Sequence, residues 1–125
     1  MNDLIPDSEL EILKMLWEKA PQSLPEIMAN LQQPCTWKAT TIQTLLTRLI
    51  KRGAVQQEGR KRLYQYSPLI SQDEYRLIAC NHLLDKIFAG NTYDLIRFSI
   101  ENKIISPSDF ETFKQHLKPG EYRIS

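Results

Sequence analysis

Hydroxyl, amide and cationic side chains recur at helical spacing between residues 36 and 53, a stretch that holds no acidic side chain. The side chains that share or flank one side of such a helix are Thr40, Gln43, Thr44, Thr47, Arg48, Lys51 and Arg52. Hydrogen-bond donors and positive charge, with nothing to repel phosphate, suit the major groove of DNA. On a lone helix such a face is more often simply solvated, so the interpretation depends on its surroundings.

The other side of the same stretch is apolar and must pack against something. Ile42, Leu45, Leu46, Leu49 and Ile50 recur at the offsets that form one buried stripe of a helix. Gly53 follows where a left-handed C-terminal cap would end the helix. We therefore predict an amphipathic helix over residues 36–53, with its polar face outward.

The distribution of charge favours a polyanionic partner, although the net charge of +1 on 125 residues does not. Residues 36–62 hold seven basic side chains against Glu58 as the one acid. Residues 1–35 hold two basic and six acidic side chains, and residues 71–125 hold seven and eight. Positive charge is thus gathered in a middle block, as an electrostatic footprint for nucleic acid would be.

Two shorter helices are expected before this one. Ser8 and Glu11 form a capping-box pattern that opens a helix over residues 8–19, which Pro21 stops. Ser23 and Glu26 form a second box, followed by a helix to about residue 32. The apolar residues expected to be buried on this second helix are Ile27, Met28 and Leu31. The order of helix, short helix, turn and basic helix is a helix-turn-helix arrangement.

The spacing of apolar residues changes after Gly53. Residues 54–58 and 62–67 are short, β-prone and partly alternating, and residues 58–61 supply a turn between them. The predicted hairpin ends at Pro68 and carries Arg60, Lys61 and Arg62 at its tip. Such a tip can contact a phosphate or the minor groove beside the basic helix, and Arg48, Lys51 and Arg52 on that helix are likewise expected to hold phosphates. Residues 1–70 therefore predict a winged helix, and the fold class is mainly α with a small β-hairpin.

Three further helices follow, over residues 71–88, 92–103 and from 106 onward. Ser71 and Glu74 form a capping box at the start of the first, and Gly90 closes it. These helices carry more apolar surface than so short a region can bury alone. We therefore predict a homodimer formed by residues 71–118, followed by a tail over residues 119–125. Its interface residues would be Leu77, Cys80, Leu83, Leu84, Ile87, Phe88, Phe98, Phe110 and Phe113. The alternative is that this region folds back onto the winged helix of the same chain.

Other chemistry receives little support. Cys35, Cys80, His82 and His116 match no metal-ligand spacing, so neither a metal nor a cofactor is expected. A phosphate loop, a nucleophile elbow and a paired acid are all missing, which argues against an enzyme. The sequence contains no membrane-length apolar run and no signal peptide, and its two thiols fit a reducing, cytoplasmic compartment. Trp17 is expected in the core; Trp37 belongs either there, which is preferred, or against the DNA backbone.

Several stretches resemble the BlaI/MecI-type penicillinase and methicillin-resistance repressors, whose wider family includes copper-responsive repressors. They are IPDSELEIL and LWE at residues 5–13 and 16–18, WKATTIQTLLTRL and KRG at 37–49 and 51–53, LYQYSP at 63–68 and LLDKIFAG at 83–90. The resemblance implies a dimeric repressor on an inverted repeat of the TACA/TGTA kind. It places Arg48 and Lys51 near the DNA backbone. The residues that it places at the end of the helix that reads base edges are Lys38, Thr40, Thr41, Gln43 and Thr44.

Two departures from the family limit what the resemblance implies. The copper-responsive members carry paired Cys-x-Cys motifs near the C-terminus, and residues 118–125 contain no Cys, so copper sensing is not expected. The penicillinase repressors are inactivated by a protease that cleaves an Asn-Phe bond, and this chain contains no such dipeptide. The sequence therefore predicts a homodimeric repressor of unknown inducer. The alternative is a winged helix that binds another protein without sequence-specific DNA contact.

Overall fold

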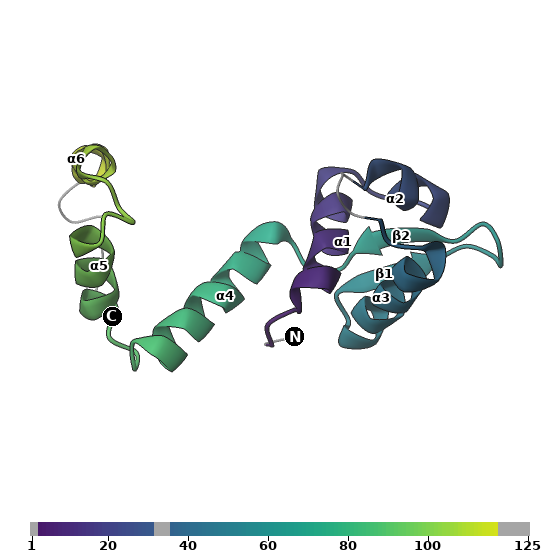
Figure 1. Cartoon of the computed structure of the whole chain (residues 1–125), viewed down its shortest axis with the longest axis horizontal. Helices are drawn as coiled ribbons and strands as arrows, with labels where there is room; N and C mark the ends of the chain where they lie inside the picture. Colours follow the sequence, from purple (N-terminus) through teal and green to yellow (C-terminus); the bar gives the residue numbers. More distant parts are fainter. Residues whose placement is uncertain (1–2, 32–35, 118–125) are drawn as a thin grey trace. The chain divides into compact units, whose positions relative to one another are not determined.

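The computed structural model describes residues 3–31 and 36–117. Figure 1 shows helices and one hairpin, which divide into two compact units, Met1–Cys80 and Asn81–Ser125. The predicted mainly helical fold with a small hairpin is confirmed. Gln32, Pro34, Cys35 and the predicted tail over residues 119–125 lie outside the described residues.

The first unit is built on two helices that share an apolar core. Helix α1 spans Asp7–Glu18 and helix α3 spans Ala39–Arg52. The fully buried side chains along their contact come from both helices and are Ile12, Leu13, Leu16, Ile42, Leu46 and Leu49. The stripe predicted on the basic helix is therefore confirmed, with Ile50 half-buried at its margin.

The two ends of α3 differ in how well the sequence marked them. Gly53 adopts φ +81° and donates its N–H to the Ile50 carbonyl, so the predicted left-handed cap is confirmed. At the other end the helix begins at Ala39, after an extended Lys38, rather than at Thr36. Gly53 marks the C-terminal end in the sequence, because the cap needs a left-handed backbone that glycine adopts easily. The N-terminal end has no such mark, because Lys38 makes no side-chain cap.

The expected capping box at Ser8 and Glu11 is wrong. Helix α1 starts at Asp7, because the Pro6 carbonyl already accepts from the Leu10 N–H. Ser8 therefore lies inside the helix, and Glu11 instead pairs with Lys14 at 3.2 Å. Asp7 and Glu9 supply the negative charge that favours the positive end of a helix.

Helix α2, Leu24–Asn30, confirms the second capping box. The Ser23 N–H donates to the Glu26 carboxylate at 3.2 Å, and the Glu26 N–H donates to the Ser23 hydroxyl at 3.3 Å. Ile27 is fully buried, but the expected burial of Met28 is wrong, since 41% of it is exposed. A helix of seven residues turns one narrow face to the core, and Met28 lies about 100° around the axis from Ile27.

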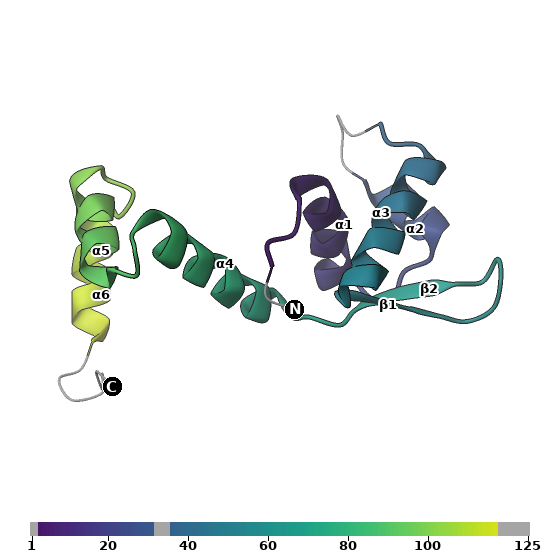
Figure 2. The ribbon, with the colours of Figure 1, turned by 90° about the horizontal axis from the view of Figure 1, so that it is seen from below.

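The hairpin pairs strand β1, Val55–Glu58, with strand β2, Gln65–Pro68, in antiparallel register. Its loop is longer than predicted, because Arg62 adopts φ +75° and the Leu63 N–H turns back to the Arg60 carbonyl at 2.7 Å. Gly59 is required there, since a Cβ would lie 2.7 Å from the Leu63 carbonyl oxygen. Figure 2 shows this loop extending beyond the three helices as a wing.

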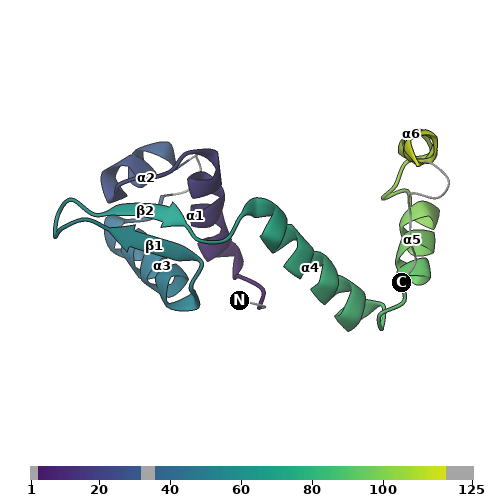
Figure 3. The same ribbon diagram turned by 180° about the vertical axis from the view of Figure 1, so that it is seen from behind.

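Gln22 connects three elements of the first unit. Its backbone pairs with Tyr66 of β2 on the side away from β1, with N···O distances of 3.0 and 2.8 Å. Its buried amide donates to the carbonyls of Met15 and Lys19 and accepts from Asn30. Figure 3 shows β2 running alongside α1 and α2, which these bonds hold together.

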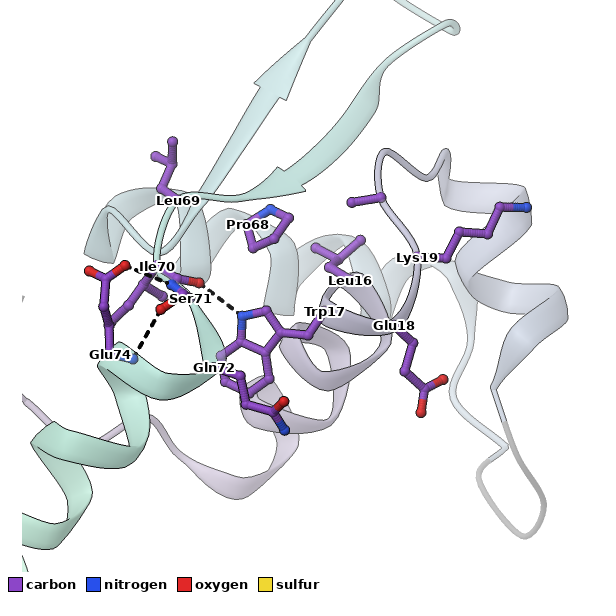
Figure 4. A pocket seen from close by; sticks show the side chains of 11 residues that line it. Leu16, Trp17, Glu18, Lys19, Pro68, Leu69, Ile70, Ser71, Gln72 and Glu74 are labelled. Atoms are coloured by element: carbon purple, nitrogen blue, oxygen red, sulfur yellow. Dashed lines mark hydrogen bonds between the residues drawn. The ribbon is translucent and has the colours of Figure 1, made fainter.

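Helix α4, Gln72–Ile87, begins in the first unit and ends in the second. The Ser71–Glu74 capping box is confirmed, with N···O distances of 3.2 and 3.0 Å. Tyr75 is buried, and its hydroxyl accepts the Ile5 N–H at 2.8 Å. An open groove of about 570 Å³ lies beside the start of α4 (Figure 4). It is lined by the end of α1 and by residues 68–72 and 74.

The second unit contains the rest of α4, helix α5 (Thr92–Glu101) and helix α6 (Pro107–His116). Gly90 adopts φ +76° after α4, as the sequence predicted. Asn91 and Ser106 cap α5 and α6 by accepting N–H bonds three residues on, each at 3.0 Å. Phe88 and Phe98 meet edge to face, with ring centroids 5.8 Å apart.

Candidate nucleic-acid interface

The polar face of α3 is open to solvent along its length. Every hydroxyl, amide or cationic side chain that the sequence placed there at the reading end or beside it is exposed: Lys38, Thr40, Thr41, Gln43, Thr44, Thr47, Arg48 and Lys51. Their apolar neighbours on the helix are buried or half-buried against α1 and β1. The fold therefore presents these donors together on one exposed helical surface.

The N-terminus of α3 adds to the positive character of this surface. Lys38 precedes the helix in an extended conformation and makes no side-chain cap. The Thr41 N–H donates to the Lys38 carbonyl at 3.0 Å, and the Lys38 side chain has no oxygen to cap the start of the helix, where the positive end of the helix dipole lies. Such a terminus favours an anion such as phosphate.

Two threonine hydroxyls on the face are already bonded to the helix. Thr44 Oγ1 donates to the Thr40 carbonyl and Thr47 Oγ1 donates to the Gln43 carbonyl, each at 2.9 Å. These bonds fix the side chains while the hydroxyl oxygens keep acceptor capacity. Each residue can thus offer a base edge an acceptor and a methyl group from a defined position.

The wing supplies a second group of cations. Arg60, Lys61 and Arg62 are all exposed in the loop between β1 and β2, and so is Leu63. The sequence reasoning placed Leu63 in the returning strand, but it lies in this loop, with 73% of its surface exposed. The three cations lie away from the core and can contact the phosphates of a DNA backbone beside α3.

Arg52 differs from the other predicted phosphate ligands. Its Nε–H donates to Glu9 Oε1 at 2.7 Å, and the Glu9 side chain is 2% exposed. The sequence reasoning missed this partner. A signal was present, because Glu9 precedes Ile12, Leu13 and Leu16 by three, four and seven residues and so lies on the buried stripe of α1.

The two tryptophans both pack against the core. Trp17 and Trp37 are half-buried and contact the buried apolar cluster of the first unit. The expectation for Trp17 is confirmed. For Trp37, the packing favours the preferred of the two interpretations, the core.

The residues predicted to form a dimer interface are poorly covered in the single chain. Leu84, Phe88 and Phe110 are half-buried, and the others are exposed: Leu77, Cys80, Leu83, Ile87, Phe98 and Phe113. Exposed side chains of this size and number are unusual on a surface that remains in water.

Within residues 3–31 and 36–117, no three His, Cys, Asp or Glu side chains come together to hold a metal ion. The same residues include no helix with the length and apolar character needed to cross a membrane.

Comparison with known proteins gives consistent matches. The family model described as "Penicillinase repressor" matches residues 5–119. The penicillinase repressor of Bacillus licheniformis is 29% identical over 119 residues, covering 95% of this chain and 93% of that protein. A solution structure of the DNA-binding domain of the repressor BlaI is 36% identical, with a TM-score of 0.52 over 60% of this chain and 92% of that one.

A second solution structure bears on what this fold binds. It shows the monomeric form of Bacillus licheniformis BlaI in complex with the blaP half-operator. The identity is again 36%, with a TM-score of 0.50 over 60% of this chain and 92% of that one.

Proposed function

The chain belongs to the penicillinase repressor family, and from this premise we propose that it is a sequence-specific DNA-binding transcriptional repressor. The observation that carries the proposal is the exposed, acid-free polar face of α3 beside a cationic wing. The similar domain that has been solved with a half-operator supports it. A repressor acts where the genome lies, so we assign the protein to the cytoplasm.

We assign two kinds of contact to the surface. Base edges in the major groove are read by Lys38, which precedes α3, and by the side chains of α3 that follow it, namely Thr40, Thr41, Gln43, Thr44 and Thr47. Phosphates are held by the cations at the far end of the helix and on the wing, namely Arg48, Lys51, Arg60, Lys61 and Arg62. Repression follows when the bound protein occupies a promoter.

The repressor acts as a homodimer on a pseudo-palindromic operator. The exposed apolar side chains of α4, α5 and α6 support this, because a second copy is the simplest cover for them. Two-fold symmetry of the protein then requires two half-sites of opposite orientation. An inverted repeat of the TACA/TGTA kind is the operator that the family resemblance suggests.

Selection of bound duplexes from random DNA, combined with salt titration, tests the proposal. We expect an enriched inverted repeat and a log K that falls against log salt with a slope of about −5 to −7, which corresponds to about six to eight of the dimer's assigned cations meeting phosphates at once. A slope near zero with no enriched sequence would contradict it. That outcome would favour a winged helix that binds another protein.

A further inference from the structure

A buried carboxylate joins the first helix to the end of the recognition surface. Glu9 lies in the first turn of α1, and Arg52 is the last residue of α3, 43 positions later in the chain. The Arg52 Nε–H meets Glu9 Oε1 at 2.7 Å, a short distance for a charge-assisted hydrogen bond. The Glu9 side chain is 2% exposed and that of Arg52 is 33% exposed.

Because the Glu9 carboxylate is buried, it needs Arg52 as its partner. A carboxylate removed from water is stable only when a cation and hydrogen bonds compensate for its lost solvation. Arg52 provides that compensation through its Nε–H, so withdrawing this donor from Glu9 to reach a phosphate would leave the carboxylate buried and unpaired. Arg48 lies one turn earlier on α3 and is also exposed, but among the described residues it has no ion-pair partner.

The pair is also a directional contact in an otherwise apolar interface. The contact of α1 with α3 consists mainly of Ile and Leu side chains, whose attraction does not depend on orientation. Such a contact tolerates small rotations and shifts of one helix on the other. A hydrogen bond from the planar guanidinium to a buried oxygen restricts both, because its energy depends on angle as well as distance.

We propose that Glu9 and Arg52 form a positioning pair that sets the rotation and axial placement of α3 on α1. Arg52 thereby supports discrimination between DNA sequences through the orientation of the reading side chains, and not through a phosphate contact. This inference rests on the proposed DNA-binding function. It separates two arginines that the sequence alone treats alike, Arg48 and Arg52.

Salt titration of matched variants tests the proposal. Arg48→Gln should lower the magnitude of the slope of log K against log salt by about two for a dimer, since one phosphate contact is lost in each protomer. Arg52→Gln should leave that slope unchanged. It should instead lower the ratio of specific to non-specific affinity by about tenfold or more, the size of one mismatched base pair. Equal slope changes for the two variants would overturn the proposal.

Arg52→Lys supplies a second comparison. Lysine keeps the positive charge but lacks the fixed Nε–H geometry. A positioning role predicts that Arg52→Lys loses specificity as Arg52→Gln does, whereas a phosphate ligand would tolerate the change. All affinities are measured below the unfolding temperature of each variant, so that lost stability is not mistaken for lost specificity.

Nuclear magnetic resonance of the wild-type chain tests the pair without any substitution. The Arg52 Nε–H signal should exchange slowly with water and stay in place when operator DNA is added, while that of Arg48 shifts. An Arg52 signal that exchanges as fast as that of Arg48 would contradict the pair itself. Wild-type protein with no sequence preference would instead contradict the proposed function, and the exchange measurement would still decide the pair.

Discussion

The indole N–H of Trp17 donates a hydrogen bond of 2.8 Å to the carbonyl oxygen of Ile70. Ile70 directly precedes the capping box of α4, so the bond ties the end of α1 to the start of α4 (Figure 4). The Trp17 ring also packs on Tyr75, with centroids 6.2 Å apart. Within the first unit, α1 and the first turns of α4 are therefore held by polar and aromatic contacts together.

Replacing Trp17 tests this joint. Trp17→Phe keeps a ring but removes the donor, and should lower the free energy of unfolding by about 1–3 kcal/mol, because the Ile70 carbonyl loses its partner. Urea denaturation measures the change. Tyr93→Phe, at an exposed tyrosine, is the control and should have no effect. An unchanged urea midpoint for Trp17→Phe would show that the bond adds nothing to stability.

Arg48→Ala should weaken binding to every DNA sequence by a similar factor. Arg48 is exposed at the far end of the polar face, where a cation meets the backbone, and phosphate contacts carry no sequence information. Affinities for operator and random duplexes, measured side by side, provide the check. Arg97→Ala in α5 is the control and should leave both unchanged. A variant with altered base preference alone would refute the assignment of Arg48.

Thr44 should contribute base preference at one position in each half-site. Its hydroxyl proton is bonded to the Thr40 carbonyl, which leaves the oxygen as an acceptor and the methyl free for a thymine. Thr44→Val keeps a methyl and removes the oxygen, whereas Thr44→Ser does the reverse. Binding-site selection with both variants separates the two contacts. Profiles identical to wild type for both would count against direct readout by Thr44.

Leu83→Asp should produce monomers and reduce operator affinity by at least about tenfold. Leu83 is exposed in the single chain, and a carboxylate there would be desolvated in an apolar dimer interface. Asn81→Asp introduces the same side chain at an exposed polar position of the same helix and should remain dimeric. Sedimentation equilibrium distinguishes the two states. A Leu83→Asp chain that still sediments as a dimer would rule out this interface.

Local signals predicted much of the fold. The capping patterns predicted at Ser23 and Ser71 lie within one helical turn, and each forms in the structure. The pattern at Ser8 is just as local but fails, because Pro6 already supplies the first helical acceptor. The stripe on α3 succeeded because four buried positions over two turns leave only one orientation for the helix.

Contacts between distant residues could not be predicted in the same way. The pairing of Glu9 with Arg52 and the bridge between Gln22 and Tyr66 each join residues more than 40 positions apart. The period of α1 places Glu9 on its buried stripe, but no period or spacing identifies the partner of such a residue, so the pair becomes visible only once the helices are packed. The DNA contacts and the dimer interface remain predictions, since each needs a second molecule.

The bridge from Gln22 to Tyr66 also limits unwanted association. An unpaired strand edge is a template on which another chain can add a strand, and Gln22 occupies the middle of the edge of β2 that faces away from β1. The outer side of β1 in the described hairpin is four residues long and ends in the charged Glu58. At high protein concentration, the hairpin therefore offers little unpaired strand backbone on which an aggregate of extended β-structure could form.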